Sequence, residues 1–186
     1  MDSNIIFPKR KQLRLNNYNY NSVGAYFITI CTHERKCILS NIVGAIHESP
    51  EHKLSQYGKI VDEIINNTSN YKNAQKDKYV IMPNHIHFLI SIIDEDKSNY
   101  YSQLRAIRES PLRNERSVIS KLIGYIKMNV SKSINERFNE TKIWQRGFHD
   151  HIVRNEFDYE KIAKYIEENP IKWHLDCFFV NEESQG

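Results

Sequence analysis

The spacing of apolar residues predicts four strands in this chain. Residues 25–32 are rich in β-branched and aromatic side chains, which is typical of a buried strand. Two further strands are predicted over 77–82 and 85–93, and Pro83 and Asn84 turn or bend the chain between them. Residues 149–154 predict a short fourth strand.

Three segments have the apolar spacing of helices. Apolar residues recur at helical intervals over 54–67 and 117–138. A last helix is predicted over 157–169, because Asn155 is a suitable N-cap and Pro170 stops further growth. The order strand, helix, strand, strand, helix, strand, helix indicates an α+β fold. We expect a ferredoxin-like sandwich, with the helices on one face of a mainly antiparallel sheet.

The strand predicted over 85–93 places two histidines side by side. Side chains alternate between the faces of a strand, so His85 and His87 share one face and Ile86 and Phe88 share the other. Neutral imidazoles are common metal ligands, and two of them on a rigid strand form half of a metal site. Two surface histidines on a half-exposed strand fit the spacing at least as well. The spacing alone leaves both interpretations open.

The last predicted helix carries a second candidate pair. Tyr165 and Asn169 are four residues apart and therefore share one helical face. A phenol can act as a nucleophile, and an amide oxygen can be a third, neutral metal ligand. A tyrosine beside Ile166 is more often part of the core. Tyr125 and Asn129 have the same spacing on another helix, so spacing does not separate the two tyrosines.

Composition and length limit the class of protein. The 186 residues are 40% hydrophobic with only 6 glycines and 5 prolines, so we expect one globular domain over residues 1–186. No apolar run approaches the roughly 20 residues of a membrane span, and the start lacks the pattern of a secretory signal. Three cysteines without a CxxC pair argue against a disulfide framework and a structural zinc site. We therefore expect a cytoplasmic protein.

Basic residues gather in places, although the net charge is only +3. We expect a basic N-terminal arm over residues 1–20 and a mobile, highly charged insertion over 94–116. The candidate phosphate contacts of the arm are Lys9, Arg10, Lys11 and Arg14. Basic clusters together with 11 tyrosines suit single-stranded nucleic acid, whose phosphates bind cations and whose bases stack on rings. A solvated face or a disordered tail would have the same composition.

A mixed segment before the fourth strand is a further candidate for nucleic-acid contacts. Its rings can stack on bases, and its arginine can bind phosphate or guanine. The candidate residues are Trp144, Gln145, Arg146, Phe148 and His149. A packed Trp–Phe cluster with Arg146 at its rim is the alternative. His149 and His151 form a second histidine-x-histidine pair, which we interpret as DNA contacts or as groups behind the metal ligands.

Four segments in this order resemble the HUH-type single-tyrosine transposases, in particular the REP-associated tyrosine transposases, which are enzymes of the insertion-sequence type. The segments are GAYFITICT at 24–32, VIMPNHIH at 80–87, IWQRGFHD at 143–150 and KYIEENP at 164–170. The resemblance extends from about residue 9 to residue 173. The joint pattern is far more specific than the histidine pair alone.

The resemblance implies a role for each member of the site. His85 and His87 correspond to the histidine-hydrophobic-histidine metal motif, and Tyr165 corresponds to the nucleophile. Asn169 stands where the broader family often has glutamine, so it keeps the amide oxygen on a shorter arm. The implied activity is nicking and strand transfer of single-stranded DNA near a hairpin through a 5′-phosphotyrosine intermediate. The implied cofactor is Mg²⁺ or Mn²⁺, although two histidines alone would favour Zn²⁺ or Mn²⁺.

Two other functions fit parts of the sequence. A catalytically silent protein on the same scaffold would bind the hairpin without cutting it, but the presence of His85, His87 and Tyr165 favours the enzyme. A zinc hydrolase would use the histidine pair alone, and the lack of an HExxH motif disfavours it. The expected partner in either DNA-related case is hairpin DNA resembling a REP palindrome on a bacterial chromosome. The protein could be a monomer or a homodimer, and it would be associated with the nucleoid.

Overall fold

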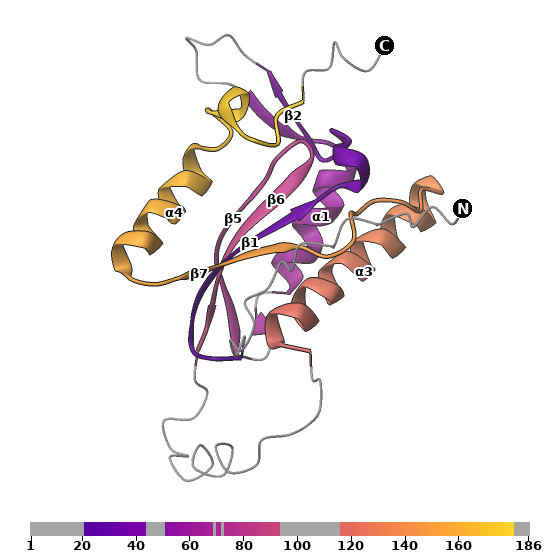
Figure 1. Ribbon diagram of the computed structural model, residues 1–186. Coiled ribbons are helices and arrows are strands. Elements are labelled where there is room, and N and C mark those ends of the chain that lie inside the picture. Colours follow the sequence, from indigo (N-terminus) through magenta and orange to yellow (C-terminus); the bar gives the residue numbers. More distant parts are fainter. Residues whose placement is uncertain (1–20, 44–50, 69, 72, 94–115, 181–186) are drawn as a thin grey trace, which may run out of the picture.

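The computed structural model describes residues 21–43, 51–68, 70–71, 73–93 and 116–180. A five-stranded sheet forms its centre, with the strand order β4-β5-β6-β1-β7 and antiparallel pairing throughout (Figure 1). Its strands are β1 (Gly24–Cys31), β4 (Asn70–Tyr71), β5 (Ala74–Ile81), β6 (His85–Ile92) and β7 (His149–Val153). The helices are α1 (Gln56–Asn67), α3 (Val118–Phe138) and α4 (Glu156–Glu168). A separate hairpin consists of β2 (Ser40–Val43) and β3 (Glu51–Leu54), and single 3-10 turns span His33–Arg35 and Trp173–Leu175.

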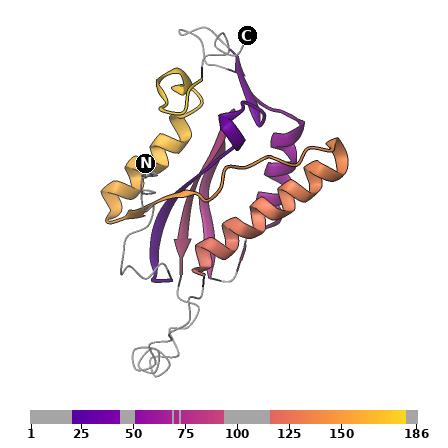
Figure 2. The same cartoon turned by 45° about the vertical axis from the view of Figure 1, so that its right-hand side comes forward.

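Helices cover both faces of the sheet (Figures 1 and 2). α1 and α3 lie on the face that carries Tyr26 and Phe88, and they form the larger core there. α4 lies on the opposite face, where Ile162 and Ile166 pack in a second core with Leu89. The expectation that all helices share one face is therefore wrong. Every side chain of β6 from 85 to 90 is buried, so both faces of this strand need a covering layer.

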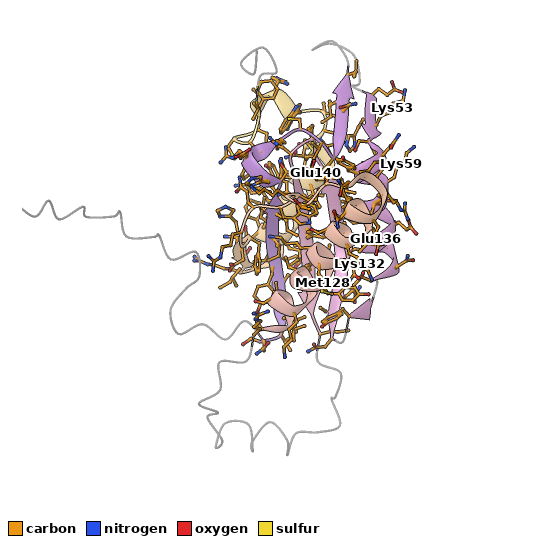
Figure 3. The ribbon with its side chains drawn as sticks, turned by 90° about the vertical axis from the view of Figure 1, so that its right-hand side faces the viewer. Lys53, Lys59, Met128, Lys132, Glu136 and Glu140 are labelled. Carbon is orange, nitrogen blue, oxygen red and sulfur yellow. The ribbon has the colours of Figure 1, made fainter. Side chains whose placement is uncertain are left out.

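The α+β class and the elements predicted from the spacing are confirmed, with ends that differ by up to three residues. Ser117 caps α3 through its side chain, and the Asn155 side chain accepts a hydrogen bond of 2.8 Å from the Asp158 amide at the start of α4. The outer side of α3 is polar and exposed, as Lys132 and Glu136 show (Figure 3). The hairpin of β2 and β3 was not predicted, because its strands are short and mostly polar.

Some sequence predictions fall outside the described residues. The basic arm over 1–20 and the proposed contacts Lys9, Arg10, Lys11 and Arg14 lie there. The charged insertion over 94–116 also lies there, except for Arg116, which is exposed. These remain predictions. Among the helices in the described part of the chain, none has the length and apolarity required to cross a membrane.

Two helical glycines offer a matched test of the packing. A Cβ atom at Gly58 of α1 would lie 2.0 Å from the carbonyl oxygen of Leu39, whereas one at Gly124 of α3 would meet nothing within 4 Å. We expect Gly58→Ala to lower the free energy of unfolding by about 2 kcal/mol or more, because backbone must move. Gly124→Ala should raise it by roughly 0.5–1 kcal/mol through helix propensity. Urea denaturation measures both, and equal effects of the two variants would contradict the packing described here.

Candidate active site

The two histidines of β6 converge under α4. His85 Nε2 and His87 Nε2 are 3.0 Å apart, and the two side chains are 0% and 2% exposed. The alternative of two surface histidines is therefore excluded. Burial lowers the pKa of both imidazoles, and the closeness of His85 lowers that of His87 further, because two adjacent rings resist being protonated together. Both rings are thus neutral at neutral pH, which is the form that binds metal ions.

The other ring nitrogens of the histidines have defined partners. His85 Nδ1 lies 2.9 Å from the side-chain oxygen of Asn84, and His87 Nδ1 lies 2.9 Å from the hydroxyl of Thr29. Thr29 is the residue of β1 that pairs with His87, so the register of β1 and β6 brings this hydroxyl to the ring. These contacts fix the orientation of both rings and aim their Nε2 atoms at one point.

Tyr165 reaches the histidines from α4. Its hydroxyl lies 3.4 Å from His87 Nε2, and its ring centroid lies 5.3 Å from that of His87. The side chain is 39% exposed, so one side of the phenol faces solvent. Tyr125 is similarly exposed, at 43%, but it projects from α3 on the opposite side of the sheet, where its ring lies 5.9 Å from Tyr71. The fold therefore separates the two tyrosines that spacing could not.

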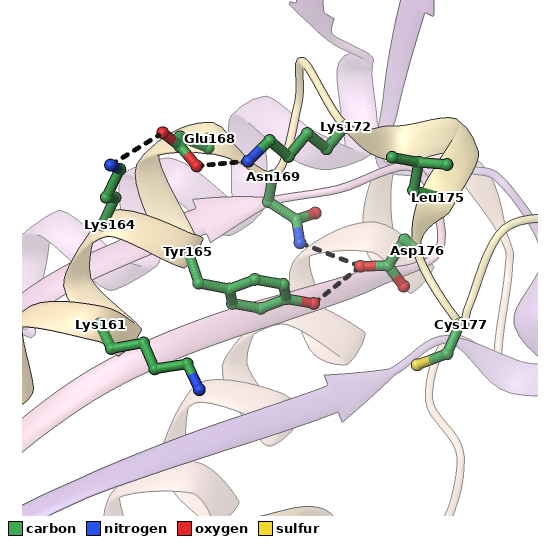
Figure 4. Close-up of a pocket in the computed structure, with 9 residues that line it drawn as sticks. All are labelled: Lys161, Lys164, Tyr165, Glu168, Asn169, Lys172, Leu175, Asp176 and Cys177. Atoms are coloured by element: carbon green, nitrogen blue, oxygen red, sulfur yellow. Dashed lines mark hydrogen bonds and ion pairs between the residues drawn. The ribbon is translucent and has the colours of Figure 1, made fainter. Parts of the chain in front are cut away.

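Asp176 is a member of the site that the sequence analysis missed. One of its carboxylate oxygens accepts hydrogen bonds from the Tyr165 hydroxyl at 2.8 Å and from the Asn169 amide at 2.9 Å (Figure 4). Its other oxygen accepts from the Phe178 backbone N–H at 2.7 Å. Asp176 follows the last helix in irregular chain, where neither strand nor helix spacing applies. The only available signal was an acidic residue shortly after the KYIEENP segment.

The donor set fits a divalent metal ion. Ligand atoms of His85, His87 and Asp176 lie within 4.8 Å of one another, and they form a group that could hold a metal ion. Asn169 is buried beside them, and its side-chain oxygen has no hydrogen-bond partner among the described residues. A buried oxygen without a partner is costly unless a cation or water satisfies it. Asn169, the predicted third ligand, thus lies at the site together with the unpredicted carboxylate.

The environment of Tyr165 keeps its phenol protonated. Burial raises the pKa of Tyr165 well above its ordinary value, and the hydrogen bond to the Asp176 carboxylate raises it further. Burial also acts to raise the pKa of Asp176. Hydrogen bonds from Phe178, Asn169 and Tyr165 outweigh that effect and hold the pKa of this carboxyl below its ordinary value. At neutral pH the site therefore pairs a neutral phenol with a carboxylate.

The C-terminal segment, which we define as residues 170–180, covers the histidines. The rings of Trp173 and Phe178 have centroids 5.9 Å and 4.6 Å from that of His85. The Arg35 guanidinium lies 5.1 Å from the centre of the Phe178 ring. Together with Tyr165 of α4, this segment leaves the His85 and His87 rings at most 2% exposed in this conformation.

A groove of about 470 Å³ adjoins the phenol. α4 and the C-terminal segment line it, and three lysines lie along it. Lys164 and Lys172 pair with Glu168 at 3.7 Å and 2.7 Å. Lys161 projects beside Tyr165 and makes no hydrogen bond to the other residues drawn (Figure 4). The groove thus offers a cation next to the proposed nucleophile.

The predicted DNA contacts of the mixed segment divide into two groups. Trp144 and Phe148 are half-buried against the larger core, as the packed-cluster alternative expects. Arg146 and His149 are exposed, and His149 shares the face of His87 because both pair with Thr29. Gln145 is half-buried, and its backbone N–H donates to the Cys31 carbonyl at 3.0 Å.

Lys127 of α3 holds the turn that carries Arg146. Its ammonium donates to the backbone carbonyls of Gln145 at 2.6 Å and Gly147 at 2.8 Å. Gly147 has a φ of 81°, a conformation that favours glycine. The Arg146 side chain is therefore presented to solvent from a turn that is fixed on both sides.

Comparisons with known proteins found similar chains and a solved structure with the same fold. No family model matches the chain. An uncharacterized protein of Haemophilus influenzae is 33% identical over 175 residues, which cover 92% of this chain and 94% of that protein. A protein of the same species named as a REP-associated tyrosine transposase is 25% identical over 161 residues, which cover 85% of this chain and 77% of that protein. A solved structure of a REP-associated tyrosine transposase bound to a REP hairpin has the same fold. Its TM-score is 0.51 at 18% identity, with 86% of this chain and 74% of that chain covered.

Removal of the Asp176 charge tests the metal group. We expect Asp176→Asn to weaken Mn²⁺ binding by at least about 10-fold, since even groups behind metal ligands are worth roughly 10–100-fold. Asp158→Asn is the control, because this carboxylate lies at the start of α4 and contacts His151 instead. Isothermal titration calorimetry measures the affinities. Unchanged affinity in Asp176→Asn would remove this residue from the metal group.

Proposed function

From the similarity to a named REP-associated tyrosine transposase, we propose that the chain belongs to that family, and that it nicks single-stranded DNA at hairpin-associated sites and rejoins the strands. The observation that carries this proposal is the meeting of Tyr165, His87 and Asp176 within a single chain. The Tyr165 hydroxyl lies 3.4 Å from His87 Nε2 and 2.8 Å from Asp176. A phenol beside a candidate metal group is the arrangement that covalent phosphodiester chemistry needs.

Tyr165 is the proposed nucleophile. Its oxygen forms a bond to the scissile phosphorus, and the bond from phosphorus to the 3′ oxygen breaks. The phenol proton passes through Asp176, which already accepts its hydrogen bond, to water, and the departing 3′ oxygen takes up a proton from water to become a hydroxyl. The product is a 5′-phosphotyrosine and a free 3′-hydroxyl. Attack by a 3′-hydroxyl reverses these steps, so joining requires no nucleotide cofactor.

His85, His87 and either Asp176 or Asn169 would hold the divalent ion. When bound, Mg²⁺ or Mn²⁺ would neutralise the nonbridging oxygens of the phosphate. Two imidazoles with one oxygen ligand suit Mn²⁺ better than Mg²⁺ by ligand preference. The role of Asn169 as third ligand is supported by its buried, unpartnered oxygen, and that of Asp176 by its charge.

The proposed substrate is single-stranded DNA with a hairpin similar to a REP palindrome. Support comes from the named relative and from two exposed cations, Lys161 in the groove beside Tyr165 and Arg146 on the turn before β7. His149 lies on the same face of the sheet. Lys9, Arg10, Lys11 and Arg14 are proposed to bind hairpin phosphates. Such a substrate implies a cytoplasmic protein associated with the nucleoid.

A catalytically silent hairpin-binding protein is the second candidate. One observation favours it: the C-terminal segment covers both histidines, whose side chains are at most 2% exposed. A protein that never moves this segment would bind DNA without cutting it. The two candidates differ in one product, a covalent protein–DNA adduct.

The adduct experiment uses a labelled hairpin oligonucleotide with a single-stranded flank, incubated with the protein and Mn²⁺. We expect a band on a denaturing gel that contains both protein and DNA. Tyr165→Phe should abolish it, because the attacking oxygen is lost. Tyr125→Phe is the matched control and should keep it, since that tyrosine is similarly exposed on the opposite side of the sheet.

The possible results separate the candidate functions. Retarded DNA on a native gel without any adduct supports the silent binder. Cut strands without attached protein support a metal-dependent hydrolase instead. An adduct that survives Tyr165→Phe and disappears in Tyr125→Phe would overturn the assignment of the nucleophile.

Hairpin affinity tests the Arg146 turn. We expect Arg146→Ala to weaken binding by about 1–3 kcal/mol, the usual worth of an arginine contact to a base. Lys127→Met should weaken binding by a similar amount, because the carbonyls that fix the turn lose their donor. Lys132→Ala, an exposed cation further along α3, is the control and should have little effect. Fluorescence anisotropy at fixed salt measures all three, and full affinity in Arg146→Ala would exclude this turn from the DNA interface.

A further inference from the structure

We propose that Asn84 is a positioning residue with two separable roles. Its side-chain oxygen orients the metal-binding nitrogen of His85, and its side-chain nitrogen holds the C-terminal segment over the site. The first role rests on the metal group of the proposed function. The second role concerns the protein alone and needs neither metal nor DNA.

The partner of the Asn84 nitrogen fixes the orientation of the amide. Asn84 Nδ2 lies 2.8 Å from the backbone carbonyl oxygen of Phe178. A carbonyl oxygen can only accept, so the NH₂ group of the amide must face Phe178. The amide oxygen then faces His85 Nδ1 at 2.9 Å. Because that oxygen can only accept, His85 must carry its proton on Nδ1, and its Nε2 keeps the lone pair that a metal ion requires.

The backbone of Asn84 holds this amide in place. The Asn84 carbonyl accepts hydrogen bonds from the backbone N–H of Thr32 at 2.9 Å and from the Thr32 hydroxyl at 3.0 Å. Thr32 is fully buried, and Asn84 is almost so. The side chain therefore starts from a fixed point between His85 and Phe178, and it has little room to find other partners.

The second histidine is held in a different way. The Thr29 hydroxyl, 2.9 Å from His87 Nδ1, can donate or accept a hydrogen bond. Without a metal ion, the 3.0 Å contact to the lone pair of His85 Nε2 places the His87 proton on Nε2; with a metal ion on that nitrogen, the proton would lie on Nδ1 and face Thr29. The Asn84 amide allows only one form of His85 while Phe178 occupies its NH₂ group. Asn84 therefore fixes which ring nitrogen of His85 carries the proton and which can bind a metal ion. Thr29 allows the proton of His87 to lie on either ring nitrogen.

This arrangement connects the metal group to the covering segment. If the Phe178 carbonyl leaves, the NH₂ group of Asn84 loses its acceptor, and the amide is free to turn its nitrogen toward His85. The orienting contact to Nδ1 is then no longer enforced. The position of residues 176–180 and the ligand form of His85 are consequently linked through one side chain.

Three variants separate the two roles. Asn84→Asp keeps an oxygen that accepts from His85 Nδ1 but has no donor for the Phe178 carbonyl. Asn84→Ala loses both contacts. Thr29→Val removes the partner of His87 and leaves Asn84 intact. Mn²⁺ affinity is measured by calorimetry, and opening of residues 176–180 is measured by hydrogen exchange of their amides, both without DNA.

The expected results differ among the variants. Asn84→Ala should bind Mn²⁺ about 10–100-fold more weakly than the wild type, the usual effect of removing a group that orients a metal-binding histidine. Asn84→Asp should bind Mn²⁺ at least about 5-fold more tightly than Asn84→Ala does. Amides in 176–180 should exchange at least about 10-fold faster than wild type in both Asn84 variants. In Thr29→Val the amides of residues 176–180 should exchange at the wild-type rate, while Mn²⁺ binding should weaken.

Two results would overturn the inference. One is wild-type Mn²⁺ affinity in Asn84→Ala, and the other is unchanged exchange of 176–180 in both Asn84 variants. If Asn84→Ala fails to fold, the comparison of Asn84→Asp with wild type still tests the hold on Phe178. Failure of the proposed function looks different: the wild type would form no DNA adduct while the Asn84 variants behaved as expected.

Discussion

Burial of two imidazoles on one face of a sheet is the constraint on which the rest of this structure depends. A pair of rings placed in a dry layer must be neutral, must have partners for both nitrogens and must be covered. Residues from four parts of the fold contact and cover the two imidazoles. Thr29 comes from the neighbouring strand β1, Asn84 from the turn before β6, Tyr165 from α4 and Phe178 from the C-terminal segment.

The crossing of the chain from one face of the sheet to the other makes this site possible. β7 ends the sheet beside β1, and α4 follows it directly on the face that carries the histidines. Had α4 joined α1 and α3, the phenol would lie across the sheet from the imidazoles. One chain thus contains every group of the candidate site, and the described geometry needs no second copy to bring Tyr165 to His87.

Regular spacing accounts for what the sequence could predict. The alternation in β6 placed His85 and His87 on one face, and the cap at Asn155 with the stop at Pro170 defined α4 to within a residue. Burial of the histidines could not be predicted, because it depends on which face α4 covers. That choice is made by long-range packing of Ile162 and Ile166 against Leu89, which leaves no local pattern.

The parts of the site that were missed lie where spacing has no meaning. Asp176 and Phe178 follow the last helix in irregular chain, so no period assigns them a face. Their importance comes from contacts to residues 11 and 94 positions away, to Tyr165 and Asn84 respectively. For Trp144 and Phe148, composition pointed to stacking on bases, while their half-buried position reflects the need of the larger core for cover.

Helix α4 has a mechanical consequence for the candidate site. Tyr165 and Asn169 lie one turn apart on a helix that is capped by Asn155 and anchored by Ile162 and Ile166. A rigid rod transmits any tilt, slide or rotation to both side chains at once. A slide or shift of the whole helix therefore moves the attacking oxygen and the amide beside the histidines together, as one unit.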